Sequence, residues 1–406
     1  MPTVPHRVLR VLTRLNVGGP SSHAALLSTR LESQQFTTCL AVGEPDPTEG
    51  DLSDRVQDRG VRLVRIRGLR RPIRPLADAG ALVRLVRLVW RERPQLLHTH
   101  MAKAGAIGRM AGFLYNALGP GRRLGLRAIL IHTFHGHVLE GYFPRWQSRL
   151  FLGIECWLAR RTDCLIAVSP AIQHQLCALG IGRPDQWRVI PLGLDLSALA
   201  RLPLPEGSTR LRLGLVGRLV PIKNPGLFLE SLRRFTGRRG RTVEAVIVGD
   251  GPLRGTLERQ TQALGLQPVV RFTGWQYDLR SVYHGLDVAC LTSWNEGTPV
   301  ALIEAMAAGR AVIATQVGGV SDLLDSDQRP VGEVPHGTFR VTERGILVAP
   351  GDAEGLAEAM AAVEADIGLR RRLGEAARAY VMERFGAERL VRDITALYEE
   401  LCGIIH

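Results

Sequence analysis

Two glutamates, Glu296 and Glu304, lie eight residues apart in the segment SWNEGTPVALIEAM. Glu296 stands in a turn that contains glycine and proline, whereas Glu304 falls within an apolar pattern typical of a helix. Thr298 and Pro299 are suited to the N-cap and to the first position of that helix. The pattern therefore predicts one carboxylate on a loop and the other about one and a half turns into the helix.

The apolar run just before these glutamates, residues 287–292, indicates a buried strand. Both carboxylates are then expected at the carboxyl end of a strand, where open α/β sheets bind ligands. A carboxylate can accept two hydrogen bonds from a vicinal diol, and a nucleotide sugar carries such diols on its ribose and its hexose. The backbone N–H groups of Gly297, Thr298 and Val300, at a helix N-terminus, are suited to an anion between them. Acid–base chemistry of the glycosidase type is an alternative for the carboxylate pair.

Two cations follow the first predicted strand of the second half, in VGRLVPIKNP. They are Arg218 and Lys223, and Lys103 is the only other lysine in the chain. A forked guanidinium and a compact ammonium at a strand end would suit a diphosphate, although a solvated turn is the alternative. The later segment VGDGPLRG has the spacing G-x-G-x-x-x-G, which departs from the dinucleotide fingerprint and does not establish NAD binding.

Glycines also follow the first strand of the chain, in NVGGPSSH. Gly18 and Gly19 would let the backbone approach a phosphate or sugar closely at a helix N-terminus. A tight turn between strand and helix would need the same glycines. This motif alone therefore leaves both interpretations open.

Histidines cluster at two later strand ends. His98 and His100 lie at one, and His132, His135 and His137 at the other. Alternate residues of a strand share a face, so chelation of a metal is geometrically possible. No acidic or cysteine ligand stands beside them, and we favour a role in lining the site or hydrogen bonding to the acceptor.

Strand and helix patterns alternate along the whole chain. In the first half the predicted strands cover residues 7–15, 37–43, 61–66, 95–100, 128–135 and 164–169. In the second half they cover residues 211–218, 244–250, 269–274, 287–292, 311–316 and 345–350. This order predicts an α/β protein with two doubly wound, Rossmann-like domains facing each other across a cleft. We place the domains at residues 1–200 and 210–387, joined by a polar, proline-rich linker at residues 201–209.

Length and composition are those of an ordinary globular protein. The 406 residues exceed a single core, and 45% are hydrophobic and 22% charged. Six scattered cysteines without a C-x-x-C pair argue against a disulfide scaffold and a zinc ribbon. The N-terminus has no signal-peptide pattern and no apolar run reaches the roughly 20 residues of a membrane span. We therefore expect a cytoplasmic protein.

The positive charge is confined to one half. Of the 52 basic and 39 acidic residues, 27 and 14 lie within residues 1–200, which leaves 25 of each for the remainder. The first half should therefore attract a polyanion such as nucleic acid, an anionic membrane or a phosphorylated substrate. A basic surface that only contacts solvent is the alternative.

Arginines concentrate after the third strand and on the helix that follows it: Arg67, Arg70, Arg71, Arg74, Arg84, Arg87 and Arg91. Such residues could contact anionic lipid headgroups at the inner face of the plasma membrane. Tyr142, Phe143 and Trp146 stand among further arginines, a pattern suited to a bilayer interface or to sugar stacking. We favour a lipid-linked acceptor and a peripheral membrane location.

The segment NEGTPVALIEAMAAGRAVIATQVGGVSDLL resembles the E-x7-E signature of family 4 glycosyltransferases, which are retaining enzymes with the GT-B fold. The similarity extends over nearly the whole chain, because further motifs stand in the order that the family shows: HTHMAKAGAIGRMA, HTFHGHVLEGYF, AVSPAI, VIPLGLD, VGRLVPIKNP, VGDGPLR, FTGW and ILVAPGD. The family usually has Phe-Gly after the first glutamate, where this chain has Gly297 and Thr298.

The resemblance implies a role for each residue of the motifs. Arg218 and Lys223 would bind the donor diphosphate, and Glu304 the ribose. Glu296 and the backbone after it would bind the hexose, with His135 beside the sugar. Gly18 and Gly19 would approach the donor across the cleft, and the last helix, at about residues 388–406, would cross back onto the first domain.

The expected activity is a retaining, metal-independent transfer of a hexose or N-acetylhexosamine to a lipid-linked or polysaccharide-precursor acceptor. A UDP-linked sugar is the expected donor, with no cofactor, and His135, Glu296, Arg218 and Lys223 are the expected catalytic residues. The one D-x-D, at residues 325–327, follows a predicted helix and is interpreted as a solvated loop. A non-hydrolysing nucleotide-sugar epimerase of the same fold is an alternative. Nucleic-acid binding is another, but no helix-turn-helix or RNA-binding fingerprint is present.

Overall fold

The computed structural model describes residues 5–16, 18–32, 35–45, 50–136, 145–206, 210–237, 243–325 and 332–403. The chain divides into two compact units. The first consists of Met1–Leu194 together with Ala387–His406, and the second of Asp195–Gly386. Residues 201–206 of the proline-rich segment belong to the second unit, where the carbonyls of Leu202 and Pro203 accept hydrogen bonds from Arg378 and Arg310.

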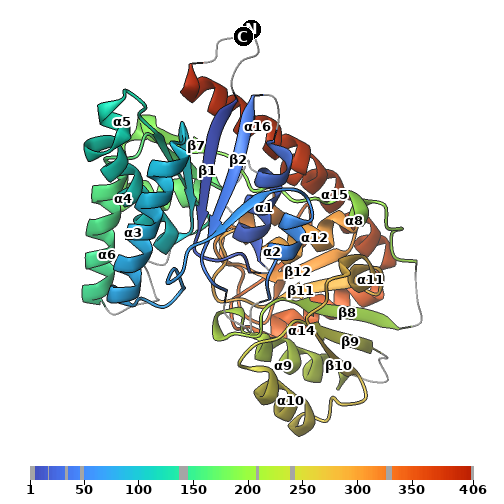
Figure 1. Ribbon diagram of the computed structural model, residues 1–406. Helices are drawn as coiled ribbons and strands as arrows, with labels where there is room; N and C mark the ends of the chain where they lie inside the picture. The colour runs from blue at the N-terminus through green and yellow to red at the C-terminus, as the bar shows by residue number, and fades with distance from the viewer. Residues whose placement is uncertain are drawn as a thin grey trace. The chain divides into compact units, whose positions relative to one another are not determined.

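The first unit is built on a seven-stranded parallel sheet in the order β3-β2-β1-β4-β5-β6-β7 (Figure 1). Its strands are β1 (His6–Leu12), β2 (Phe36–Val42), β3 (Arg62–Arg65), β4 (Leu96–His100), β5 (Ile129–Phe134), β6 (Cys164–Ala167) and β7 (Trp187–Val189). The order reverses between β1 and β4, which pair in parallel with Arg10 opposite His98. The loops after these two strands therefore diverge and leave room for a ligand.

Helices cover both faces of this sheet: α1 (Gly19–Arg30), α2 (Ser53–Gln57), α3 (Pro75–Glu92), α4 (Ala102–Leu118), α5 (Pro120–Arg123), α6 (Arg145–Ala159), α7 (Pro170–Ala178) and α16 (Ala387–Cys402). On one face α3 and α4 bury Leu85, Leu88 and Tyr115 against β1 and β4. On the other face α1 and α16 lie side by side (Figure 1). The C-terminal helix α16 thus completes the core of the first unit.

Helix α3 buries a stripe spaced three or four residues apart, Ala81, Leu85, Leu88 and Val89. Leu82 and Val86 are partly buried and pack against the edge of this stripe. The arginines of α3 remain exposed on the opposite side.

The second unit has a seven-stranded sheet in the order β10-β9-β8-β11-β12-β14-β13. Its strands are β8 (Leu211–Val216), β9 (Val243–Val248), β10 (Val270–Gly274), β11 (Val288–Leu291), β12 (Ala311–Thr315), β13 (Phe339–Val341) and β14 (Ile346–Val348). Only β13 runs antiparallel. Its helices are α8 (Ser197–Ala200), α9 (Pro225–Thr236), α10 (Arg254–Ala263), α11 (Leu279–His284), α12 (Val300–Ala307), α13 (Val320–Leu324), α14 (Ala353–Ala365) and α15 (Ile367–Phe385).

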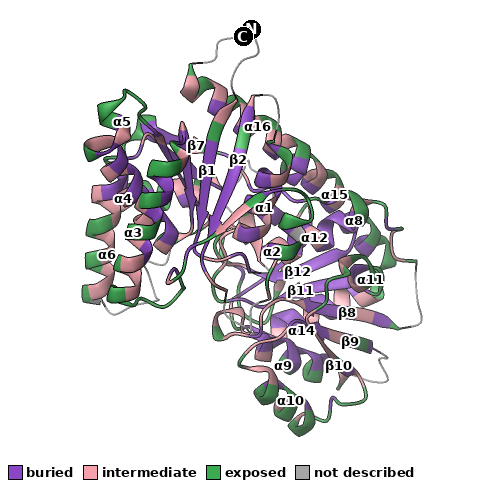
Figure 2. Ribbon diagram, viewed as in Figure 1, coloured by how far each residue is buried: buried purple, intermediate pink, exposed green. Residues whose placement is uncertain are grey.

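The central strands of both sheets are buried, as the purple strands in Figure 2 show, whereas the edge strands β3, β10 and β13 are partly exposed. Each of the twelve predicted strands is present, with ends that differ by up to three residues. Two strands escaped the sequence analysis, β7 and β13, because three-residue edge strands carry too short a pattern. Within the described residues, no helix has the length and apolarity needed to cross a membrane.

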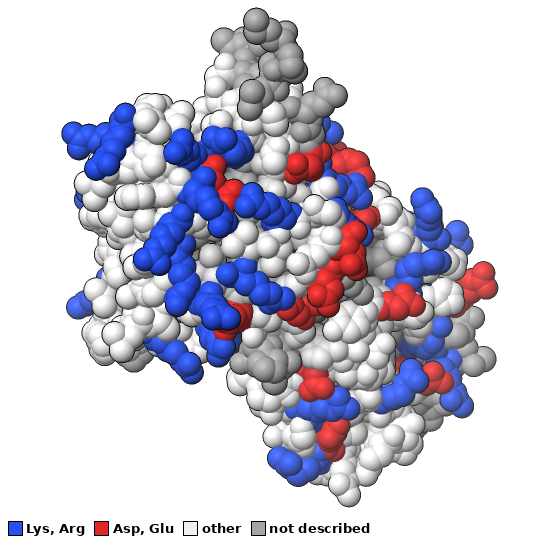
Figure 3. Space-filling model, in the orientation of Figure 1, with Lys and Arg blue, Asp and Glu red and all other residues white. Residues whose placement is uncertain are grey.

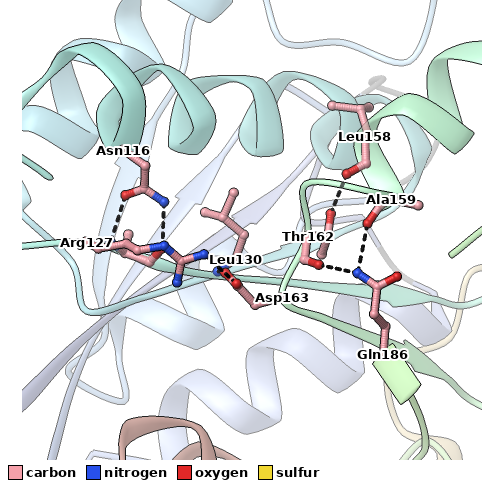
Figure 4. A network of polar contacts seen from close by, with 9 residues as sticks. Asn116, Arg127, Leu130, Leu158, Ala159, Thr162, Asp163 and Gln186 are labelled. Carbon is pink, nitrogen blue, oxygen red and sulfur yellow. Dashed lines mark hydrogen bonds and ion pairs between the residues drawn. The ribbon is translucent and has the colours of Figure 1, made fainter. Parts of the chain in front are cut away.

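A polar network fastens the amino ends of β5, β6 and β7 in the first unit (Figure 4). Asp163 accepts hydrogen bonds from Arg127 at 2.5 Å and from the backbone N–H of Leu130 at 2.8 Å. Asn116 exchanges two hydrogen bonds of 2.8 Å with the backbone of Ala128. Gln186 donates to the carbonyl of Ala159, the last residue of α6, and to the carbonyl of Thr162. These contacts satisfy backbone groups at the amino edge of the sheet.

Candidate active site

An ion pair links two loops at the carboxyl edge of the second sheet. Lys223, in the loop between β8 and α9, places Nζ 2.5 Å from Oε1 of Glu296, in the loop between β11 and α12. Ser293 donates to the same carboxylate oxygen at 2.5 Å. Thr292 Oγ1 donates to the carbonyl of Lys223, and the N–H of Trp294 to the carbonyl of Ile222. The residues predicted for diphosphate and hexose are therefore direct neighbours.

Both charges of this pair are partly withdrawn from water. The Glu296 side chain is 8% exposed and that of Lys223 is 27% exposed. A carboxylate at that depth needs its cation and its hydroxyl donor to offset lost hydration. A diphosphate that recruits Lys223 would leave Glu296 with Ser293 and free to accept hydrogen bonds from other hydroxyls.

The loop after β12 supports this site through close backbone contact. A Cβ on Gly318, which has φ of +48°, would lie 1.9 Å from the carbonyl oxygen of Glu296. A Cβ on Gly319 would lie 2.1 Å from that of Gly297. Glycine is required at both positions, and the N–H of Gly319 donates to the carbonyl of Glu296 at 3.2 Å. The loop after β12 thus holds the Glu296 loop in place.

Helix α12 begins at Val300, with Pro299 as its N-cap at φ −77° and ψ 99°. The prediction that Pro299 is the first helical residue and Thr298 the cap was therefore wrong by one position, because Pro299 still has extended ψ. No side chain caps this helix. In the described ranges, no protein group accepts a hydrogen bond from the N–H of Gly297, Thr298 or Val300. These three donors can bind an anion.

Glu304 lies in the second turn of α12 and is partly buried. Tyr283, on α11, donates from Oη to Glu304 Oε2 at 3.0 Å and to the carbonyl of Ala301 at 3.0 Å. Burial raises the pKa of Glu304 to about 7, against the opposing effect of the Tyr283 hydrogen bond. The same burial raises the pKa of Tyr283 well above its usual range. Tyr283 was missed by the sequence analysis, because a tyrosine on a neighbouring short helix has no signal that links it to Glu304.

Arg218 follows β8 in the same loop as Lys223, and the backbone around it is closely packed. A Cβ on Gly249 would lie 2.0 Å from the carbonyl oxygen of Gly217, and one on Gly251 would lie 2.5 Å from that of Leu219. Gly249 and Gly251, the first two glycines of VGDGPLRG, therefore allow close contact between two loops, and this contact requires no dinucleotide. Asp325 ends α13, and residues 326 and 327 of the D-x-D lie outside the described residues.

The first unit gathers histidines at the carboxyl edge of its own sheet. His98 Nδ1 lies 2.6 Å from Tyr398 Oη, and its Nε2 lies 2.7 Å from Thr133 Oγ1. His132 Nδ1 contacts Thr99 Oγ1 at 2.8 Å. These two rings are therefore held by hydroxyl groups of the core. His137 lies outside the described residues.

His100 and His135 meet at the same edge, with His100 Nδ1 3.2 Å from His135 Nε2. His23, on α1, packs against both rings, at centroid distances of 5.7 and 5.1 Å. Burial lowers the pKa of His135 to about 4 and places those of His23 and His100 well below their usual range. The sequence analysis missed His23, although it closes the NVGGPSSH motif.

Gly18 precedes α1 with φ of 172°, an extended conformation that any residue adopts. A Cβ there would meet only Asn16 Nδ2, at 3.6 Å. Local folding therefore does not require glycine at position 18. At Gly18 the structure therefore does not support the tight-turn interpretation. The interpretation as a close approach by a ligand remains open.

The seven arginines predicted to face an acceptor or a membrane are all exposed. Figure 3 shows a band of basic side chains over the first unit around α3. Acidic neighbours offset part of this charge, because Arg70 Nε lies 2.6 Å from Glu44 and Arg91 Nε lies 2.9 Å from Glu92. Arg84 donates to the carbonyl of Arg67 at 3.3 Å, which fixes its position near the loop before α3.

Two family models match this chain, one for each unit. Residues 18–193 match a model described as "Glycosyl transferase 4-like domain", and residues 201–380 match "Glycosyl transferases group 1". Two doubly wound units, each with a polar edge at its strand ends, have the GT-B fold. The chain belongs to the family 4 glycosyltransferases, and it acts on nucleotide sugars in glycan biosynthesis.

Relatives and solved structures agree with this assignment. The chain is 29% identical over 310 residues to the UDP-Gal:alpha-D-GlcNAc-diphosphoundecaprenol alpha-1,3-galactosyltransferase of Escherichia coli, which covers 73% of this chain and 76% of that protein. It is 26% identical over 415 residues to a D-inositol 3-phosphate glycosyltransferase of Kribbella flavida, covering 94% and 91%. HepE of Anabaena, solved with UDP and glucose, has a TM-score of 0.76 at 20% identity, covering 97% and 100%. Sucrose-phosphate synthase of Thermosynechococcus elongatus has a TM-score of 0.75 at 22% identity, covering 98% and 100%.

Proposed function

We propose that the protein transfers a hexose or N-acetylhexosamine from a UDP-linked donor to a lipid-linked or polysaccharide-precursor acceptor, with retention of anomeric configuration and without a metal. The observation that carries this proposal is the constellation at the carboxyl edge of the second sheet. There Lys223, Glu296 and Glu304 stand beside backbone N–H groups that have no partner among the described residues.

The donor diphosphate is assigned to Lys223, to Arg218 and to the N–H groups of Gly297, Thr298 and Val300. Departure of a nucleoside diphosphate develops negative charge, and two cations with a helix N-terminus stabilise it. Their combined charge takes the place that a divalent ion has in metal-dependent transferases. Lys223 would exchange Glu296 for phosphate when the donor binds, which couples donor binding to release of the Glu296 carboxylate.

The two glutamates are assigned to the two ends of the donor. Glu304, with the Tyr283 hydroxyl beside it, accepts hydrogen bonds from the ribose diol, and Glu296 accepts them from the hexose. Neither glutamate is assigned as a covalent nucleophile, and Ser293 would keep its hydrogen bond to Glu296 Oε1 when Lys223 moves to the phosphate. Attack on the same face as the departing phosphate accounts for retention, with His135 as the further catalytic residue that the family resemblance assigns.

The acceptor is assigned to the basic surface of the first unit. The loop that carries Arg67, Arg70, Arg71 and Arg74 also exposes Ile73 at 56%, and Leu76, in the first turn of α3, is 92% exposed. Apolar side chains that project among arginines suit the interface of an anionic bilayer. The galactosyltransferase relative from Escherichia coli acts on a diphosphoundecaprenol-linked sugar, which supports a lipid-linked acceptor for this chain.

A thermal-shift comparison of UDP and UMP in EDTA, followed by product NMR, tests this proposal. UDP at about 100 times its Kd should stabilise the protein by about 2.7 kcal/mol without added metal, and UMP by less at the same concentration. An α-configured donor should give an α-linked product. A β-linked product, or UDP binding that appears only with Mg²⁺, would contradict it.

A further inference from the structure

Three histidines from different elements converge at the carboxyl edge of the first sheet. His100 is the last residue of β4, His135 follows β5, and His23 lies on α1. One ring nitrogen from each lies within 4.8 Å of the other two. No other group of three His, Cys, Asp or Glu side chains in the described part of the chain meets this condition.

Unsatisfied nitrogens distinguish His23 from the neighbouring histidines. His23 and His100 are 1% and 0% exposed. Neither nitrogen of His23 has a hydrogen-bond partner among the described residues. His98, equally buried, has both nitrogens bonded to hydroxyl groups. A buried imidazole without partners is costly, and a ligand at this point would satisfy it.

The chemistry of the cluster selects the class of ligand. Burial lowers the pKa of all three rings, so the imidazoles are neutral at pH 7 and keep a lone pair available. Three neutral imidazoles suit Zn²⁺ or a similar transition metal, and not the hard cations Mg²⁺ and Ca²⁺.

The distances are also appropriate. Tetrahedral zinc with bonds of about 2.0–2.1 Å holds its nitrogens about 3.3–3.4 Å apart. His100 Nδ1 and His135 Nε2 are already 3.2 Å apart. Small side-chain rotations of His23 would complete the triangle. We propose that His23, His100 and His135 form a binding site for Zn²⁺ or a similar borderline transition-metal ion, with a fourth position for water or an anion.

Arg10 sets the strength of this site. It is fully buried on β1, near the cluster, and it contacts the Ser28 and Tyr398 hydroxyls at 3.4 Å. Its positive charge opposes a second cation and favours an anion such as hydroxide as the fourth ligand. We therefore expect weaker binding than at a closed structural zinc site, with a Kd on the order of 1 μM.

Metal binding has a consequence for catalysis, which rests on the proposed function. His135 is assigned to the reacting sugar, and a ring bound to zinc cannot also serve there. Zn²⁺ should therefore inhibit transfer. Binding of the metal itself does not depend on that assignment, so the two can be tested separately.

The first experiment titrates the tag-free, chelator-treated wild-type protein with Zn²⁺ by calorimetry and with Co²⁺ by visible absorption. We expect one equivalent of Zn²⁺ and the intense visible bands of tetrahedral Co²⁺ without thiolate charge transfer. His23→Gln, His100→Gln and His135→Gln should each weaken Zn²⁺ binding at least about 10-fold. His174→Gln removes an exposed histidine of α7 and should leave the affinity unchanged.

A second measurement separates loss of the site from loss of the fold. Each variant should keep its UDP-induced thermal shift, because the UDP residues belong to the second unit. The zinc-dependent fraction of inhibition, relative to each variant's own zinc-free rate, should decrease for His23→Gln and persist for His174→Gln. Wild-type protein that binds no Zn²⁺ at 100 μM, or binds it as well after all three substitutions, would overturn the proposal. Zinc binding by the wild type together with full transfer activity of His135→Gln in chelator would instead refute the role of His135 and leave the metal site standing.

Discussion

The two units place their polar residues at equivalent points, yet they hold them in opposite ways. In the first unit, buried and neutral imidazoles lie together beside a fully buried Arg10. In the second unit, Lys223 and Glu296 neutralise each other at the end of their strands. The strand order reverses between β1 and β4 in one sheet and between β8 and β11 in the other. The same topology therefore supplies two ligand-binding sheet edges whose side chains differ in chemistry.

The difference follows from burial and charge. Cations and carboxylates in the second unit are tolerated because they are paired and partly exposed, and both can exchange their partner for a charged ligand. Imidazoles in the first unit can be buried without an oppositely charged partner, because they lose their own charge. The first edge is thus suited to neutral hydrogen bonding or to a metal, and the second to a phosphate and hydroxyl groups.

Among the substitutions that test this difference between the units, removal of the Lys223 side chain should have the largest effect on turnover. Lys223→Ala takes away the phosphate ligand and leaves the buried Glu296 carboxylate without its cation, so turnover should decrease about 100- to 1,000-fold. UDP affinity should decrease more than UMP affinity. Steady-state kinetics and thermal shifts measure both effects.

The other lysine provides a matched control for this substitution. Lys103 lies in the first unit with its ion pair to Asp78 at 2.7 Å and a side-chain exposure of 13%. Lys103→Ala should lower stability while leaving UDP affinity unchanged. Equal losses of UDP and UMP affinity in Lys223→Ala would argue against a phosphate role.

Replacement of Arg67, Arg70, Arg71 and Arg74 by glutamine tests the basic surface of the first unit. Each arginine near an anionic bilayer contributes up to about 1 kcal/mol, and Glu44 offsets part of the charge of Arg70. Affinity for phosphatidylglycerol liposomes should thus decrease about 100-fold, and salt should weaken binding of the wild type. Donor binding should be unaffected.

The control for that variant removes four exposed arginines of the second unit, Arg233, Arg234, Arg371 and Arg372. It should keep its liposome affinity. If both variants lose affinity equally, net charge and not the first unit's surface decides membrane binding.

Glu304→Gln should show, through the pH dependence of stability, that the pKa of Glu304 is raised. In the folded protein this pKa is about 7 instead of the ordinary 4.5. Wild-type protein therefore loses stability as pH rises from about 4.5 to about 7, because the folded state resists ionisation of Glu304. The variant avoids this loss. By pH 7 its free energy of unfolding, relative to that of the wild type, should therefore have risen by about 1–3 kcal/mol. Urea unfolding at pH 4.5, 6 and 8 measures the difference, and the exposed Glu383→Gln should not show it.

Substitution of two histidines of the first unit by leucine should have different effects on the free energy of unfolding. His98→Leu leaves the Tyr398 and Thr133 hydroxyls without their partner and should cost about 1–3 kcal/mol. His23→Leu removes a buried ring whose nitrogens lack partners among the described residues, and should be neutral or stabilising by about 1 kcal/mol in chelator. A large loss of stability for His23→Leu in urea unfolding would show that its nitrogens are satisfied in solution.

Local sequence patterns determined much of this protein. Alternating apolar runs located twelve of the fourteen strands in the described residues, because a buried strand and an amphipathic helix differ in period. The strand-end positions of Glu296, Arg218 and Lys223 followed from the same runs. Motif order was sufficient to indicate the family.

Tertiary structure alone decided which of these residues meet. Lys223 and Glu296 are 73 residues apart in the chain, and His23 reaches His100 and His135 from another element. Periodicity reports the face that a residue occupies, and strand order then selects its neighbours across the sheet. The raised pKa of Glu304, and the lack of partners for the His23 nitrogens among the described residues, also depend on burial by distant segments, which no local pattern contains.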